Sequence, residues 1–91
     1  MSNTVTEKKI KGKTLAEEVY TLILHNDDVH TFNMVIKSLV KVCRHTPEQA
    51  EQCAWIVHYK GKCDVKRGAL NSITPMFEAL CERGLSVTIE A

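Results

Sequence analysis

Short stretches rich in β-forming residues occur in three parts of the chain and predict three strands. The run at 20–24 (Tyr-Thr-Leu-Ile-Leu) is rich in β-forming side chains, and residues 85–89 alternate apolar with polar positions. Between these two runs, Cys63-Asp64-Val65 is expected to form a short strand. The sequence therefore predicts one strand before, one between and one after the helical segments.

Between these strands, apolar residues recur at spacings of three and four, which is typical of helices with one buried face. Helices are expected at 32–43, at 47–59 and between Ala69 and Arg83. His30 or Thr31 is expected to cap the first of them, because short polar side chains satisfy the free N–H groups of a helix start.

The second helix has the clearest start and stop signals. Thr46 can cap it, Pro47 suits its first position, and Gln49 completes a capping box. Gly61 is expected to end it.

The third helix allows two interpretations. Pro75 either opens the helix behind Thr74 or kinks a longer helix that begins near Ala69. Gly84 is expected to end it as a C-cap.

The resulting order, β-α-α-β-α-β, predicts an α+β fold. We expect a single small domain in which three helices pack on one face of a three-stranded antiparallel sheet. Residues 20–91 make up this core domain. Residues 1–19 are polar, rich in lysine and without an apolar period, so a flexible N-terminal extension is expected there.

Composition excludes several classes of partner. A net charge of +1 argues against nucleic acid, which requires a concentrated basic surface. No apolar run approaches the roughly 20 residues that a membrane-spanning helix requires. Residues 1–13 lack the apolar segment of a signal peptide, and a cytoplasmic location is expected.

The cysteines and histidines are not spaced as metal ligands. No C-x-x-C pair occurs, and no two histidines stand four positions apart. We therefore expect reduced thiols, no metal site and no cofactor. The cysteines are Cys43, Cys53, Cys63 and Cys81, and the histidines are His25, His30, His45 and His58.

The segment Asn26-Asp27-Asp28 follows the first strand directly and admits two interpretations. These residue types favour turns, because they hydrogen-bond their own backbone. Side chains that leave a rigid strand and face solvent are also well placed to bind a small cationic group.

Two motifs together resemble the ClpS adaptor family. The first is Tyr-x-x-Ile-Leu-x-Asn-Asp-Asp at 20–28, and the second is Val-His-Tyr-Lys-Gly-Lys at 57–62. The closing Leu-x-Val-Thr-Ile-Glu at 85–90 is similar to the last strand of that family. ClpS proteins are bacterial adaptors, not enzymes, that recognise N-degrons and deliver them to a Clp unfoldase-protease.

The resemblance implies roles for the polar residues. Asn26, Asp27 and His58 are assigned to the α-ammonium and first peptide unit of the substrate. Asp28 is assigned to loop organisation or peripheral contact. His30 and Thr31 are further candidates for contact with the peptide.

The resemblance also implies a hydrophobic slot for the first side chain of the substrate. The same positions fit ordinary core packing by their periodicity alone. The slot residues are Phe32, Val35, Ala54, Val57 and Leu85.

One slot residue departs from the family pattern. Many members have methionine at the position of Ala54, and Phe32 replaces a frequent methionine and can refill part of the volume. We therefore expect binding of N-terminal Phe, Tyr, Trp and Leu, with Ile and Val tolerated better than in relatives with methionine.

The expected partners are proteins that carry N-degrons and the N-terminal domain of a ClpA- or ClpC-like AAA+ unfoldase. The family's docking surface lies in the region 64–75, where Lys66 and Arg67 replace its usual charged residues. Two alternatives remain: an enzyme with an Asp27 or Asp28–His58 acid–base pair and a cysteine nucleophile, and a structural module that resembles the C-terminal domain of the ribosomal stalk protein.

Overall fold

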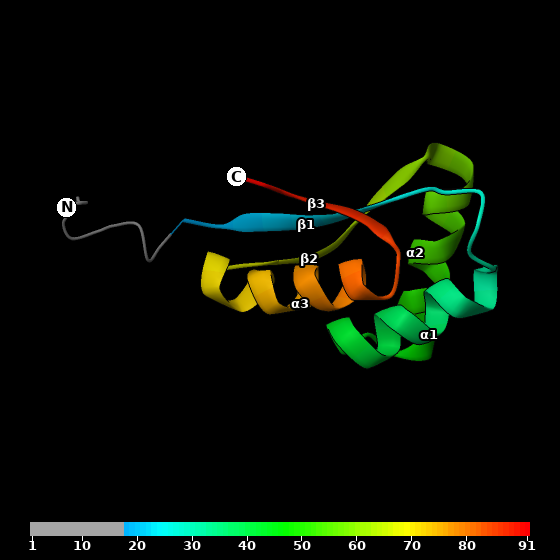
Figure 1. Ribbon diagram of the computed structural model, residues 1–91, viewed down its shortest axis with the longest axis horizontal. Coiled ribbons are helices and arrows are strands. Elements are labelled where there is room, and N and C mark those ends of the chain that lie inside the picture. Colours follow the sequence, from blue (N-terminus) through cyan, green and yellow to red (C-terminus); the bar gives the residue numbers. More distant parts are fainter. Residues whose placement is uncertain (1–17) are drawn as a thin grey trace, which may run out of the picture.

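The computed structural model describes residues 18–91, and the first 17 residues, which carry most of the predicted extension, lie outside the described part (Figure 1). The elements follow the predicted order. They are β1 (Tyr20–His25), α1 (Phe32–Cys43), α2 (Pro47–Lys60), β2 (Lys62–Gly68), α3 (Leu70–Glu82) and β3 (Ser86–Glu90).

The three strands form one antiparallel sheet in the order β2-β1-β3, with β1 in the centre. The register between β1 and β2 shifts once, between Leu22 and Ile23, so that Val65 has no direct partner on β1. The predicted fold class, an α+β domain with three helices and a three-stranded antiparallel sheet, is confirmed.

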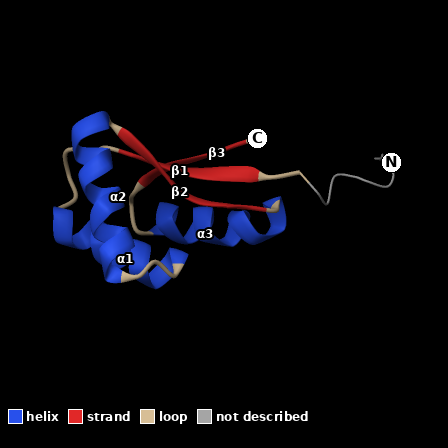
Figure 2. Cartoon of the chain, turned by 180° about the vertical axis from the view of Figure 1, so that it is seen from behind, coloured by secondary structure: helices blue, strands red, loops and turns tan. Residues whose placement is uncertain are grey.

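Helix α3 runs along the sheet, whereas α1 and α2 pack together at one end of the molecule (Figures 1 and 2). Leu22 and Leu24 of the central strand, both at most 1% exposed, belong to the core that joins the sheet to the helices. The helices contribute the other fully buried large residues, which are Ser38, Leu39, Cys43, Ile73 and Leu80.

The local signals at helix ends are confirmed. Thr31, not His30, caps α1, and its side chain accepts a hydrogen bond from the Met34 N–H at 3.1 Å. The capping box of α2 is complete, with Thr46 and Gln49 bonded in both directions. Both helices therefore begin where a threonine satisfies the free N–H groups.

Pro75 lies inside α3, so the interpretation of one longer helix is the correct one. The hydroxyl of Thr74 donates to the Leu70 carbonyl at 2.8 Å in the turn before it. Gly84 follows the helix with φ +84°, in the left-handed region that favours glycine, which confirms the predicted stop.

Strand β2 is longer than predicted. It continues from Cys63 to Gly68, because Lys66, Arg67 and Gly68 pair with the first half of β1. The Lys66 ammonium donates to the Cys43 carbonyl at 3.0 Å, so this residue stabilises the C-terminal end of α1.

Candidate functional site

A pocket of about 480 Å³ lies between the β1–α1 loop, the start of α1 and the C-terminal half of α2. Ten residues line it, and nine of them were predicted from the sequence as site residues. They are Asn26, Asp27, Asp28, His30, Phe32, Val35, Ala54, Trp55, Val57 and His58.

A backbone hydrogen bond brings the two halves of the pocket together. The Asn26 N–H donates to the Gly61 carbonyl at 2.9 Å, directly after the last residue of β1. Gly61 ends α2 with φ +92°, and its N–H bonds the Val57 carbonyl. Because His58 lies one turn before this stop, Asn26 and His58 come to line the same cavity.

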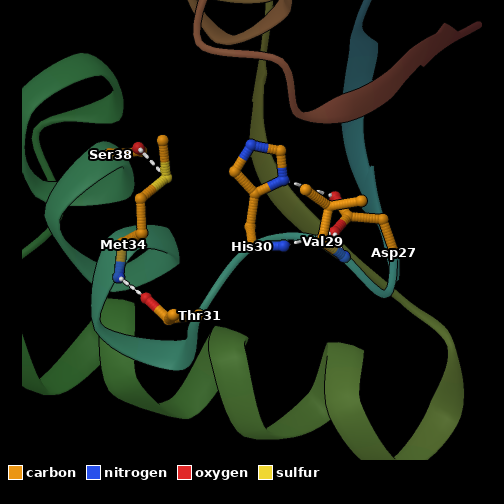
Figure 3. Close-up of polar contacts among 6 residues, drawn as sticks. All are labelled: Asp27, Val29, His30, Thr31, Met34 and Ser38. Atoms are coloured by element: carbon orange, nitrogen blue, oxygen red, sulfur yellow. Dashed lines mark hydrogen bonds and ion pairs between the residues drawn. The ribbon is translucent and has the colours of Figure 1, made fainter.

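The carboxylate of Asp27 organises the β1–α1 loop (Figure 3). One oxygen accepts hydrogen bonds from the N–H groups of Val29 and His30, each at 2.9 Å. The other lies 3.0 Å from His30 Nδ1. The hydrogen bond from the His30 N–H is the main cause that lowers the pKa of Asp27.

Asp28 has the freer carboxylate of the two. It lines the pocket, is exposed, and has no hydrogen bond or ion pair to another residue in the described part of the chain. The loop-organising role predicted for Asp28 is therefore performed by Asp27. The motif therefore forms a turn through Asp27 and at the same time lines a pocket.

His30 and Thr31, the two candidates for peptide contact, have different surroundings. The His30 ring lines the pocket and lies against the turn after α3, where a Cβ on Gly84 would be 3.2 Å from its Nε2. Thr31 is exposed, holds the α1 cap and is not among the lining residues.

The apolar wall of the pocket comes from two helices. Phe32 and Val35 are half-buried on α1, whereas Ala54 and Val57 of α2 are 3% and 5% exposed. Leu85, predicted for the same wall, is not among the lining residues. It packs in the core, because the turn that ends α3 bonds its N–H to the Leu80 carbonyl.

Trp55 also lines the pocket, although it is not among the site residues predicted from the sequence. Its ring centroid is 4.6 Å from that of Phe32 and 5.4 Å from that of Tyr59, and the latter pair is stacked. His58 meets it edge-on at 6.0 Å. The spacing 55, 58, 59 places these side chains on one helix face and was a usable signal.

The pocket combines acceptors at its rim with an apolar floor. The carboxamide of Asn26, the carboxylate of Asp28 and the imidazole of His58 can accept hydrogen bonds from a cationic group. Ala54 and Val57 present only apolar surface beside them. Such a cavity suits a small ligand that carries an ammonium next to a hydrophobic group.

None of the four cysteines lines the pocket. Burial raises the pKa of Cys43 to about 11 and of Cys63 to about 12, and neither lines the pocket. Among residues 18–91, no three His, Cys, Asp or Glu side chains are grouped to hold a metal ion. Within the same residues, every helix is too short or too polar to cross a membrane.

The family model of ClpS, the ATP-dependent Clp protease adaptor protein, matches residues 16–88. The chain belongs to the ClpS family. The match covers most of the chain and includes every residue that lines the pocket.

Two relatives from bacteria carry the same name. The ClpS of Nitratidesulfovibrio vulgaris (strain Miyazaki F) is 36% identical over 56 residues, which are 62% of this chain and 56% of that protein. The ClpS of Lawsonia intracellularis is 36% identical over 55 residues, which are 60% of this chain and 50% of that protein. The matched segments thus span about half the length of these relatives.

A solved structure matches more of the chain. The structure of Agrobacterium tumefaciens ClpS2 bound to L-phenylalaninamide is similar with a TM-score of 0.70 and 26% sequence identity. The similarity covers 79% of this chain and 94% of that one. It therefore extends over nearly all of the described residues.

Proposed function

We propose that this protein binds polypeptides through a free N-terminal α-amine and a bulky hydrophobic first residue, and delivers them to a Clp AAA+ unfoldase-protease. The N-terminal residues bound are Phe, Tyr, Trp and Leu, and the small side chain of Ala54 also leaves room for Ile and Val. The observation that carries the proposal is the convergence of ammonium acceptors and an apolar wall in one pocket of a ClpS fold.

The ligand in the related structure has the chemistry that this pocket suits. L-phenylalaninamide, bound by Agrobacterium ClpS2, carries a free α-amine, an aromatic side chain and a carboxamide in place of the next peptide bond. In this chain, Asn26, Asp28 and His58 receive the amine and first peptide unit. The first side chain enters between Val35, Ala54 and Val57 (with Phe32 at the entrance).

Asp27 contributes in a different way from the other acceptors. Its carboxylate already accepts two N–H bonds within the loop and lies beside His30. It therefore holds the loop in position and adds negative charge near the amine. Thr31, whose hydroxyl accepts the cap bond, retains its own proton for donation to a peptide carbonyl.

The magnitudes are consistent with a carrier that must release its substrate. Hydrogen bonds to a charged group contribute about 1.5–3 kcal/mol each, and burying one large side chain contributes about 1.5–3 kcal/mol. Association costs about 4–15 kcal/mol. Three polar contacts and one filled slot then correspond to roughly micromolar affinity.

Delivery requires a second surface. The exposed Arg67 on β2 is the basic residue of the region 64–75 that is free to meet the N-terminal domain of a ClpA- or ClpC-like unfoldase. Lys66 is less suitable, because its ammonium is engaged by the Cys43 carbonyl. Arg67→Glu should weaken capture of the purified unfoldase domain and leave peptide affinity unchanged.

The proposal is tested by fluorescence anisotropy with a C-terminally labelled peptide that begins with Phe. Binding of the free-amine peptide and none of its N-acetylated twin is the expected result, because acetylation removes the charge and two of the three donors. Equal binding of both peptides would overturn the proposal. A third peptide that begins with Ile measures the width of the slot at Ala54.

A further inference from the structure

The pocket continues into a row of aromatic side chains on the outer face of α2. Trp55 lines the pocket and is 43% exposed, and Tyr59, one turn later, is 74% exposed and does not line it. Their rings are nearly parallel, with an interplanar angle of 13°. Large aromatic surface of this kind is rarely left in solvent without a binding role.

The row begins at the mouth of the proposed slot. Phe32 lines the pocket from α1 and touches Trp55, with ring centroids 4.6 Å apart. The Trp55 centroid is also 6.0 Å from that of His58, which the proposed function assigns to the first peptide unit. Since successive Cα atoms are about 3.8 Å apart, the second residue of a bound peptide lies within reach of the indole.

Carboxylates lie beside the Trp55 end of this row. Glu48 and Glu51 are exposed and lie on the same face of α2 as Trp55, at helical spacings of seven and four. Asp28 adds an exposed carboxylate at the pocket rim. Lys60 directly follows Tyr59, and Lys62 is exposed just beyond Gly61, so the lysines lie at the opposite end of the row from the two glutamates.

An aromatic face with a carboxylate beside it favours one type of side chain. Arginine is cationic and planar, so its guanidinium can stack on an indole or phenol ring and pair with a carboxylate at the same time. Lysine offers the charge without the planar surface, and a neutral side chain offers neither the charge nor the pairing.

We propose that Trp55 and Tyr59 form a second subsite that recognises a basic second residue of the N-degron, arginine in preference to lysine. This inference rests on the proposed function and extends it from the first residue of the substrate to the second. The slot selects the first side chain by size, and the aromatic row selects the next one by charge and planarity.

The test compares peptides that begin with Phe and differ only at the second position, which is Ala, Lys, Arg, citrulline or Tyr. Citrulline has nearly the shape of arginine without the charge. We expect Arg to bind about two- to fivefold more tightly than Ala, with Lys and citrulline between them. If the peptide with Tyr at the second position bound as tightly as the Arg peptide or more tightly, the assignment of a basic side chain would be wrong. Equal affinity of the Arg and Ala peptides would also overturn it.

Two variants locate the subsite. Trp55→Leu keeps apolar bulk beside Phe32, and Tyr59→Ala alters an exposed residue outside the pocket lining; each should reduce the ratio of Arg to Ala affinity toward one. Ile56→Ala, on the same helix and 40% exposed, is the matched control and should keep the wild-type ratio. An unchanged ratio in both aromatic variants would overturn the proposal.

The second subsite and the proposed function can each be disproved without the other. If the Phe-Ala peptide binds through its free amine but shows no preference for Arg at the next position, the second subsite is wrong and the proposed function stands. If the Phe-Ala peptide and its acetylated twin bind equally, the proposed function itself is wrong.

Discussion

Two loops in this molecule precede helices that are capped by a threonine, and they differ in where their polar side chains lie. The loop before α2 has three residues, 44–46, and buries His45, which is 8% exposed and bonded to the Val65 carbonyl at 2.6 Å. The loop before α1 is longer, 26–31, and directs most of its polar side chains into a pocket.

Similar local signals therefore stabilise the fold in one place and line the proposed binding pocket in another. In the shorter loop, Arg44 adopts a φ of +61° and reverses the chain direction directly after α1. The ring of His45 then bonds the Val65 carbonyl, which belongs to the residue that the register shift leaves without a partner on β1. In the longer loop, Asp27 satisfies the backbone, and Asn26 and Asp28 are left free for a ligand.

The largest expected effect is a loss of peptide binding at the pocket that the longer loop lines. His58→Ala and Asn26→Ala should each weaken binding of a Phe peptide about 10- to 100-fold, because each removes a hydrogen bond to a charged group. Thermal unfolding should change little, since both side chains are exposed. Anisotropy and circular dichroism measure the two quantities; wild-type affinity in both variants would contradict the assignment.

His45→Ala should show the opposite behaviour. It removes a buried hydrogen bond and leaves the Val65 carbonyl unsatisfied, so the free energy of unfolding should fall by about 1–3 kcal/mol. Denaturant unfolding measures the loss. The folded fraction should bind peptide with wild-type affinity, and a specific loss of binding would show that the two loops are coupled.

These contrasts also mark the extent of what the sequence could predict. Helix α1, the capping box of α2 and the convergence of Asn26 with His58 follow from local spacing and from the family motif. The extra length of β2 could not be predicted, because Lys66, Arg67 and Gly68 become a strand only by pairing with a distant segment.

Three side-chain roles depended on three-dimensional geometry that neither the local spacing nor the family motif specifies. Asp27 and Asp28 are adjacent and chemically identical, so only the geometry of the loop decides which of them bonds the backbone. The burial of His45 depends on the Val65 carbonyl, 20 positions away. Leu85 packs in the core instead of the pocket wall, because of the turn at Gly84.

Filling the proposed slot should change which first residue of a peptide the pocket prefers. Ala54→Met adds bulk at a position that is 3% exposed, and the branched Ile side chain should lose affinity about tenfold relative to Phe. Peptides beginning with Ile and Phe, measured by anisotropy, provide the ratio. If Ile peptides bind this variant no worse than wild type, Ala54 does not set the width of the slot.

Removing the threonine N-cap of α1 or of α2 should have a smaller effect, on the free energy of unfolding. Thr31→Ala and Thr46→Ala should each reduce the free energy of unfolding by about 1 kcal/mol, because each leaves a helix N–H without its acceptor. Serine at either position should restore the loss in denaturant unfolding. A negligible effect at Thr31 would indicate that the longer loop does not depend on its cap.

The smallest expected effect is a pH dependence of stability that belongs to Asp27. Its pKa is lowered in the folded state, so its contribution is present above the unfolded value of about 3.9 and is lost as pH falls through the folded-state pKa. Asp27→Asn should therefore unfold at a lower temperature than wild type at pH 6, and the two unfolding temperatures should converge as pH falls below the folded-state pKa of Asp27. Asp28→Asn is the control, and a pH-independent gap between wild type and Asp27→Asn would contradict the assignment.

The most direct test of the central claim is a ¹⁵N–¹H NMR titration with L-phenylalaninamide and with its N-acetylated form. The free amine should shift the resonances of the 26–31 loop and the indole of Trp55, the one tryptophan in the chain, and leave those of His45 and its loop unchanged. The acetylated form should produce no shifts. Equal shifts from both ligands, or shifts outside the pocket, would contradict recognition of a free N-terminus at this site.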